Sequence, residues 1–145
     1  SKGRRHYRRI IGGNQMARFA RLTLIPVTDA NGDAVVYSPQ INGRIVSVRY
    51  TKAASNGYTD GVDFDLEGET SGLVVWSEDD VNASKTIYPL AEAATTAGVA
   101  LEYADGFAQC VPIATAGERL KLTVDAGGAS KTGTFDLLIE GVCLS

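Results

Sequence analysis

The 145-residue sequence is poor in the residues that most enzymes and metal sites use, with one histidine and two cysteines. A catalytic site needs a nucleophile, an acid or base, or a metal within reach of one another, and His6 lies near the start of the chain, apart from any predicted core. Cys110 and Cys143 lack the CxxC spacing of a metal or redox site, so we expect two free, partly buried thiols. We therefore expect a protein that is not an enzyme and binds no cofactor or metal ion.

Long apolar segments are also missing. No segment reaches the roughly 18 apolar residues of a membrane-spanning helix. The basic residues at the start are not followed by the apolar block of a secretory signal. These absences predict a chain that folds in a cytoplasm and does not enter a membrane.

Acidic residues are absent from the first 21 positions, which carry seven Lys and Arg side chains. The rest of the chain holds 7 basic and 17 acidic residues, a formal charge of −10. Residues 1–17 contain few apolar side chains. Ordering each residue costs about 1–2 kcal/mol, whereas burying a Leu-sized side chain returns about 1.5–3 kcal/mol. We therefore expect residues 1–17 to be an extended basic arm that takes its shape from a partner.

Arg4, Arg5, Tyr7, Arg8 and Arg9 form the densest part of this arm and are the candidate partner-binding residues. Arginine forms paired hydrogen bonds with carboxylates, so one partner class is an acidic protein surface, on another protein or on a second copy. Clustered arginine beside an aromatic residue also fits nucleic acid. The acidic remainder of the chain would repel a phosphate backbone, which favours protein. A third interpretation is that the residues before Met16 are not native.

Beyond the arm, the sequence consists of short segments separated by turn residues. Residues 62–67 and 120–125 alternate between apolar and polar side chains, as half-buried strands do. Asn31-Gly32 is a hairpin dipeptide, and a Gly-rich turn between residues 120–125 and 135–140 predicts a second hairpin. We predict that residues 18–145 form one all-β domain, an antiparallel β-sandwich or barrel of about eight strands. Leu90–Tyr103 is ambiguous between a helix and a long loop over one end of the domain.

Carboxylates are the remaining candidates for chemistry. Asp63, Asp65 and Glu67 share one predicted strand face, and Glu78–Asp80 follow the single tryptophan, Trp76. Paired carboxylates can serve a glycosidase, but a solvated strand face and a solvated turn are the preferred interpretation. Calcium at residues 60, 63 and 65 is a weaker alternative, because the spacing does not match the twelve-residue calcium loop. Three apolar residues precede Trp76, which favours a core position over the wall of a sugar-binding groove.

Two segments, VVWSEDDVNASKTIYP (residues 74–89) and GERLKLTVDAGGASKTGTFDLLIEG (residues 117–141), resemble small head structural proteins of tailed bacteriophages. That group includes capsid decoration, or cement, proteins. The resemblance implies a non-enzymatic β-sandwich or barrel that binds the major capsid protein as a trimer or dimer and reinforces the virion. The alternatives are a minor virion protein whose arm contacts nucleic acid, a head–tail or tail structural protein, and a carbohydrate-binding module.

Overall fold

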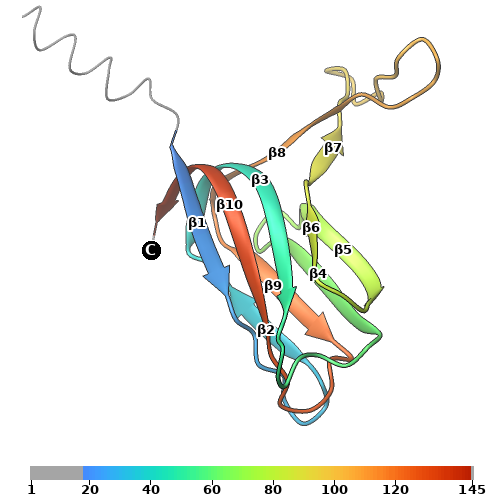
Figure 1. Ribbon diagram of the computed structural model, residues 1–145. Helices are drawn as coiled ribbons and strands as arrows, with labels where there is room; N and C mark the ends of the chain where they lie inside the picture. The colour runs from blue at the N-terminus through green and yellow to red at the C-terminus, as the bar shows by residue number, and fades with distance from the viewer. Residues whose placement is uncertain (1–17, 145) are drawn as a thin grey trace, which may run out of the picture.

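The computed structural model describes residues 18–144, with side chains for residues 18–141. This part of the chain contains ten strands and no helix (Figure 1). The strands are β1 (Phe19–Leu24), β2 (Ala34–Tyr37), β3 (Gln40–Lys52), β4 (Val62–Gly68), β5 (Val74–Val81), β6 (Lys85–Ile87), β7 (Leu90–Glu92), β8 (Cys110–Glu118), β9 (Leu120–Asp125) and β10 (Gly133–Leu144).

The strands form two antiparallel sheets. The six-stranded sheet has the order β1-β10-β3-β8-β7, and β6 pairs with β3. β8 pairs with the first half of β3 and β6 with the second half, because the 13-residue β3 is long enough for both. The four-stranded sheet has the order β2-β9-β4-β5. The predicted all-β antiparallel sandwich is confirmed, with ten strands in place of about eight.

The core lies between the two sheets and is built from alternate strand residues. β4 and β9 bury every second side chain and direct the intervening polar ones to water, as the alternation in the sequence predicts. Aromatic rings fill the centre. Phe64 lies 4.7 Å from Tyr50 and 4.8 Å from Phe135 between ring centroids. Trp76 is only 6% exposed and packs on Phe64 at 5.4 Å, so its predicted core position is confirmed.

Both predicted hairpins are wrong in their strand pairing. β9 pairs with β2 and β4, whereas β10 pairs with β1 and β3, so the Gly-rich turn between them passes from one sheet to the other. The turn at Asn31-Gly32 is present, with the Asp29 N–H donating to the Asp33 carbonyl at 2.9 Å. The strands on either side of it, β1 and β2, again lie in different sheets. Local alternation identifies the face of a strand that is buried, but it does not identify the neighbouring strand.

The ambiguous segment Leu90–Tyr103 is neither a helix nor a loop over the domain. Its first three residues form β7, which pairs with the start of β8. The remainder continues beyond the sandwich, and Figure 1 shows it extending away from both sheets. We call residues 88–112, which include β7 and the first part of β8, the β7–β8 arm.

Candidate interaction surface

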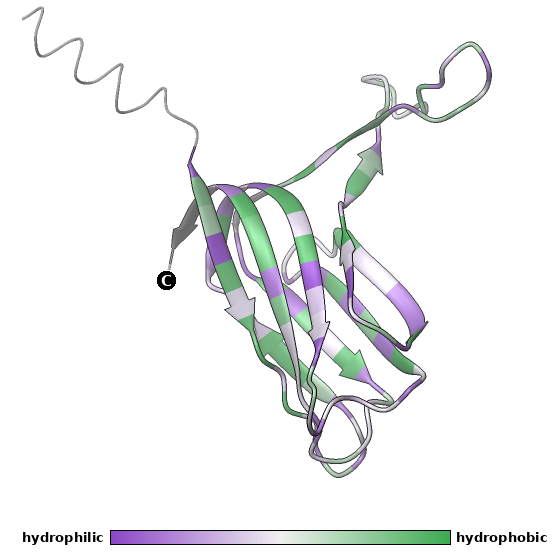
Figure 2. Cartoon of the chain, viewed as in Figure 1, coloured by the Kyte–Doolittle hydropathy of each residue, from purple (hydrophilic) through white to green (hydrophobic). Residues whose placement is uncertain are grey.

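The β7–β8 arm leaves the sandwich as a two-stranded ribbon. Leu90 pairs with Pro112, Ala91 with Val111 and Glu92 with Cys110. Every side chain from residue 94 to residue 108 is exposed. Figure 2 shows that hydrophobic residues continue from the sandwich into β7 and the arm beyond it. The distal arm therefore has no core of its own.

The tip of the arm consists of two short hairpins of the same design. In the first, the Thr95 N–H donates to the Val99 carbonyl at 2.8 Å, and in the second, the Tyr103 N–H donates to the Phe107 carbonyl at 2.8 Å. A glycine at positive φ closes each turn, Gly98 at 80° and Gly106 at 87°. A type I turn followed by a left-handed glycine is a common three-residue hairpin connection. The spacing of eight residues between these two glycines is a signal that the sequence contains.

Leu101 joins the two hairpins to the ribbon through its main chain. Its N–H donates to the Ala93 carbonyl at 2.9 Å, its carbonyl accepts from the Gln109 N–H at 3.0 Å, and Ala93 N–H donates to the Gln109 carbonyl at 2.7 Å. Each such bond contributes a net stabilisation of only about 0.5–1.5 kcal/mol. Main-chain hydrogen bonds exposed to water are thus the principal contacts that shape the tip.

The β7–β8 arm carries large apolar side chains that its own chain leaves in water. Tyr88 and Phe107 are each 71% exposed and Tyr103 is 61% exposed. The same is true of further aliphatic residues, namely Leu90, Val99, Leu101 and Val111. A run of exposed apolar residues of this kind marks an interaction site more often than a free surface. The arm is also acidic, with Glu92, Glu102 and Asp105 and no Lys or Arg.

Two hollows lie on the outer face of the six-stranded sheet where the arm begins. The first, of about 230 Å³, is mainly apolar and includes Val46, Pro89, Leu90 and Pro112 in its wall. An ion pair between Arg44 and Glu140, at 2.6 Å, borders it. The arm therefore begins beside an apolar recess.

The second hollow, of about 240 Å³, is polar and shares Tyr88 with the first. Arg21 from β1 and Arg49 from β3 line it together with Asp136 from β10. Asp136 accepts a hydrogen bond from the Thr23 hydroxyl at 2.7 Å. Neither Arg21 nor Arg49 takes part in the four ion pairs found among the described side chains. Two arginines and one aspartate therefore give this hollow a net positive formal charge.

The outer face of the four-stranded sheet has the opposite charge. Asp63, Asp65 and Glu67 project from β4, beside Asp125 on β9. The Asp65 carboxylate accepts a hydrogen bond from Ser77 at 2.6 Å, and that of Asp63 accepts one from the main chain of β5. A hydrogen bond with Asp125 is the main cause that raises the pKa of the Asp33 carboxyl at the edge of this sheet. The solvated strand face that the sequence predicts is therefore an acidic surface.

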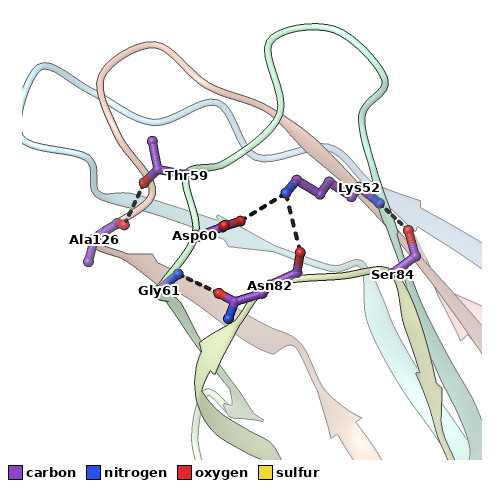
Figure 3. A network of polar contacts seen from close by, with 7 residues as sticks. All are labelled: Lys52, Thr59, Asp60, Gly61, Asn82, Ser84 and Ala126. Carbon is purple, nitrogen blue, oxygen red and sulfur yellow. Dashed lines mark hydrogen bonds and ion pairs between the residues drawn. The ribbon is translucent and has the colours of Figure 1, made fainter.

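The carboxylates considered for calcium do not meet. Asp60 lies in the loop before β4, where Lys52 Nζ donates to it at 3.1 Å and to the Asn82 carbonyl at 3.2 Å (Figure 3). Asn82 in turn accepts the Gly61 N–H at 2.7 Å, so this network ties the β3–β4 loop to the β5–β6 turn. Among the side chains of residues 18–141, no group of three or more acidic, histidine or cysteine residues is placed to hold a metal ion.

Shifted carboxylate pKa values have local structural causes. The Glu118 carboxylate accepts the N–H groups of Thr70 and Ser71, each at 3.0 Å, and the bond from Ser71 is the main cause that lowers its pKa. The ion pair with Lys85 at 2.7 Å is the main cause that lowers the pKa of Glu78. Glu118 and Glu78 are therefore held in their charged form by partners that fix a turn.

Trp76 lies in the core and not in the wall of a sugar-binding groove, the alternative that the sequence left open. Its indole N–H donates to Glu78 at 3.1 Å from within the core. The hollow beside Glu78 and Asp80, of about 290 Å³, has no aromatic side chain in its wall. Cys110 is free as expected, but it is exposed at the base of the arm rather than partly buried. Arg4, Arg5, Tyr7, Arg8 and Arg9 lie outside the described residues, as does the whole predicted arm of residues 1–17.

Together these features define a β-sandwich with an apolar hollow beside a polar, arginine-containing one, an acidic outer face on the other sheet and a projecting arm of exposed apolar residues. Residues 18–144 include no helix that could span a membrane. No protein-family profile and no curated protein matches the sequence.

Three solved structures are similar to this chain at low identity. One comes from Bacillus endospore appendages, a family of disulfide-linked pili (17% identity, TM-score 0.43, covering 90% of this chain and 92% of that chain). Another is FlhE (13% identity, TM-score 0.40, 85% and 96%). A third belongs to the Gx strain of infectious bursal disease virus (14% identity, TM-score 0.32, 87% and 32%). Likeness at these values indicates no function for this chain.

Proposed function

We propose that this protein is a structural, non-enzymatic virion component, a decoration protein that binds and reinforces the capsid of a tailed bacteriophage. The observation that carries the proposal is the β7–β8 arm, whose apolar residues from Val99 to Phe107 project beyond the sandwich. Burying a side chain of this size contributes about 1.5–3 kcal/mol. The fold does not bury these side chains, so a partner that covers them would gain this free energy on binding.

The rest of the surface supports an assembly role. The carboxylates with lowered pKa values serve turns, and the resemblance of residues 74–89 and 117–141 to phage head proteins supplies the class of assembly. In this proposal the major capsid protein is a partner, and the chain forms a trimer or dimer on the shell. A capsid presents many equivalent sites, so contacts of modest individual strength give stable attachment.

The basic residues at the start of the chain have a part in the same proposal. Arg4, Arg5, Arg8 and Arg9 pair with carboxylates on the shell, and Tyr7 adds an aromatic contact. A segment of this kind can also add a strand to an exposed sheet edge. Attachment to the shell would then use residues 1–17, and the β7–β8 arm would add a protein contact within the assembly.

The presence of the protein in virus particles is the first test. Particles purified from the source culture on a density gradient should contain the chain in a fixed ratio to the major capsid protein, as measured by quantitative mass spectrometry. Absence from particles that contain every other head protein would contradict the proposal.

The anchoring role is tested by adding purified protein back to particles made without it. The full chain should saturate the shells, and a chain lacking residues 1–15 should bind at least tenfold more weakly while its circular dichroism spectrum is unchanged. Normal occupancy by the truncated chain would refute the anchoring role of Arg4 to Arg9 without removing the protein from the virion.

A further inference from the structure

The occupant of the apolar recess can be inferred from the charge and shape of the arm. From residue 86 to residue 118 the chain has four acidic residues and no basic one. The outer face of the four-stranded sheet, with Asp63, Asp65 and Glu67, repels such a segment. The outer face of the six-stranded sheet offers two arginines, Arg21 and Arg49, and one carboxylate, Asp136, in a hollow of net positive formal charge beside an apolar hollow. That face complements the arm in both charge and polarity.

The tip of the arm presents its two rings together. Tyr103 and Phe107 close the second hairpin opposite each other, joined by the Tyr103 N–H and the Phe107 carbonyl. Opposite residues of an antiparallel pair project from the same face. Asp105 lies in the turn between them, where its carboxylate accepts the Phe107 N–H at 3.2 Å. Two rings with one adjacent carboxylate match an apolar hollow with an adjacent pair of arginines.

We propose that the β7–β8 arm of one copy docks on the outer face of the six-stranded sheet of a second copy. Tyr103 and Phe107 pack on the apolar hollow next to Tyr88, and Asp105 pairs with Arg49 and Arg21. The proposal names a partner for the surface described above and rests on the assembly role proposed for it. It requires no virus particle, so it can be tested on the purified chain alone.

The geometry limits the assemblies that this contact can build. The tip and the recess are different patches of one molecule, so the contact joins unlike surfaces. Such a contact gives a closed dimer when two copies exchange arms, or a closed ring of more copies. Without closure it gives an open filament. Tyr88 and Leu90 line the apolar hollow and also belong to the β7–β8 arm. The tip that docks on a copy therefore also contacts the base of that copy's own arm.

Sedimentation of the purified chain over a concentration series is the first experiment. The wild type should self-associate, and Tyr103→Ser/Phe107→Ser should weaken association at least about 100-fold, as loss of buried aromatic anchors does. Val35→Ser is the matched control, because it removes an exposed apolar side chain from β2 in the other sheet, and it should change association less than about threefold. A wild type that stays monomeric at every concentration would overturn the proposal.

A charge exchange tests the pairing itself. Asp105→Arg and Arg49→Asp should each weaken association about tenfold or more, and the double variant should return to within about threefold of wild type. Failure of the double variant to recover would overturn the Asp105–Arg49 contact. Chains that bind particles but never self-associate would refute this inference and leave the proposed function standing. Chains that self-associate but are absent from particles would support this inference and refute the proposed function.

Discussion

At the residue scale, Tyr58 connects the core to the loops at one end of the sandwich. Its ring is buried near Tyr50 and Phe64, at 6.2 and 5.9 Å between centroids. Its hydroxyl donates to the Pro26 carbonyl at 2.6 Å. Burial is the main cause that raises the pKa of Tyr58, and it also raises the pKa of Tyr50, because a buried phenolate lacks solvation. The buried Tyr58 hydroxyl thereby provides the hydrogen bond to a loop carbonyl, and its raised pKa makes the stability of the fold depend on pH in the alkaline range.

The raised pKa of Tyr58 predicts loss of stability at high pH. In the unfolded chain the tyrosine ionises near its ordinary pKa of 10.0, while the buried tyrosine of the folded protein keeps its proton at that pH. The free energy of unfolding should therefore be constant with respect to this group below pH 10 and fall as the pH rises above it. Urea unfolding of the wild type and Tyr58→Phe between neutral pH and pH 11 measures the effect. Phe should lower stability at neutral pH by about 1–3 kcal/mol and reduce the alkaline decline. Equal alkaline slopes would contradict this assignment.

A second prediction concerns the contact between two paired glycines, Gly43 on β3 and Gly141 on β10. Gly43 has a φ of 148°, and an added Cβ would overlap the main chain of Glu140. Gly43→Ala should therefore destabilise the protein by about 2–4 kcal/mol, from backbone strain and overpacking together. Gly72→Ala is the matched control, because Gly72 has a φ of 72° with open space around its Cβ. It should cost about 1–2 kcal/mol. Equal shifts of the two urea midpoints would show that close packing at Gly43 is unimportant.

At the element scale, alternation predicted which strand faces are buried but not which strands pair. Leu120, Leu122 and Val124 face the core as expected, yet their strand lies in a different sheet from the next one. The same alternation supports a hairpin or a crossing between sheets, because both bury the same side chains. The distance in space between residues 125 and 133 depends on all the other strands, and no local pattern contains that information.

The β7–β8 arm could not be predicted from the sequence because its strands do not alternate between buried and exposed side chains. Its alanine-rich sequence resembles a helix, and its apolar residues have no buried face to mark them as strand. The repeated Gly98 and Gly106 turns were the local signal available. The surface on which it begins combines residues from β1, β3, β8 and β10, far apart in sequence, so only the fold brings Arg21, Arg49 and Tyr88 together.

The arm should be dispensable for folding. A chain in which residues 94–108 are replaced by Asn-Gly retains the hydrogen-bonded pair Ala93 and Gln109 as the ends of a tight hairpin. Because none of the removed side chains is buried, the free energy of unfolding should change by less than about 1 kcal/mol. Leu137→Ala, in the core, should cost about 2–5 kcal/mol in the same urea titration. A loss of several kcal/mol on shortening the arm would show that it stabilises its own sandwich.

At the scale of the whole molecule, the two outer faces differ in net charge. Three carboxylates of β4 and Asp125 of β9 share one face with Lys121, whereas three arginines (Arg21, Arg44 and Arg49) share the other with Asp136 and Glu140. Opposite faces of opposite sign favour contacts between unlike surfaces of neighbouring copies, which steers association and fixes orientation. The same separation disfavours a long polyanion, since residues 22–145 carry a formal −10.

Binding of duplex DNA should therefore be weak. Fluorescence anisotropy with labelled duplex should detect no binding at physiological salt. Any binding at low salt should weaken as salt is added, because each phosphate contact lowers log affinity by about 0.9 per log unit of salt. It should disappear in a chain lacking residues 1–15, because that segment carries the clustered arginines. Affinity that persists at physiological salt and survives the deletion would favour the nucleic-acid interpretation of the basic segment.

Hydrogen–deuterium exchange of the arm amides is the most direct measurement of the central claim, that this element is made to be covered by protein. Amides of residues 94–108 should exchange rapidly in the dilute monomer, where their hydrogen bonds are open to water. They should become protected in the assembled state, whether self-associated or bound to particles, while core amides of β4 and β9 stay protected in both. Equally fast exchange of the arm before and after assembly would contradict the account, and so would full protection in the dilute monomer.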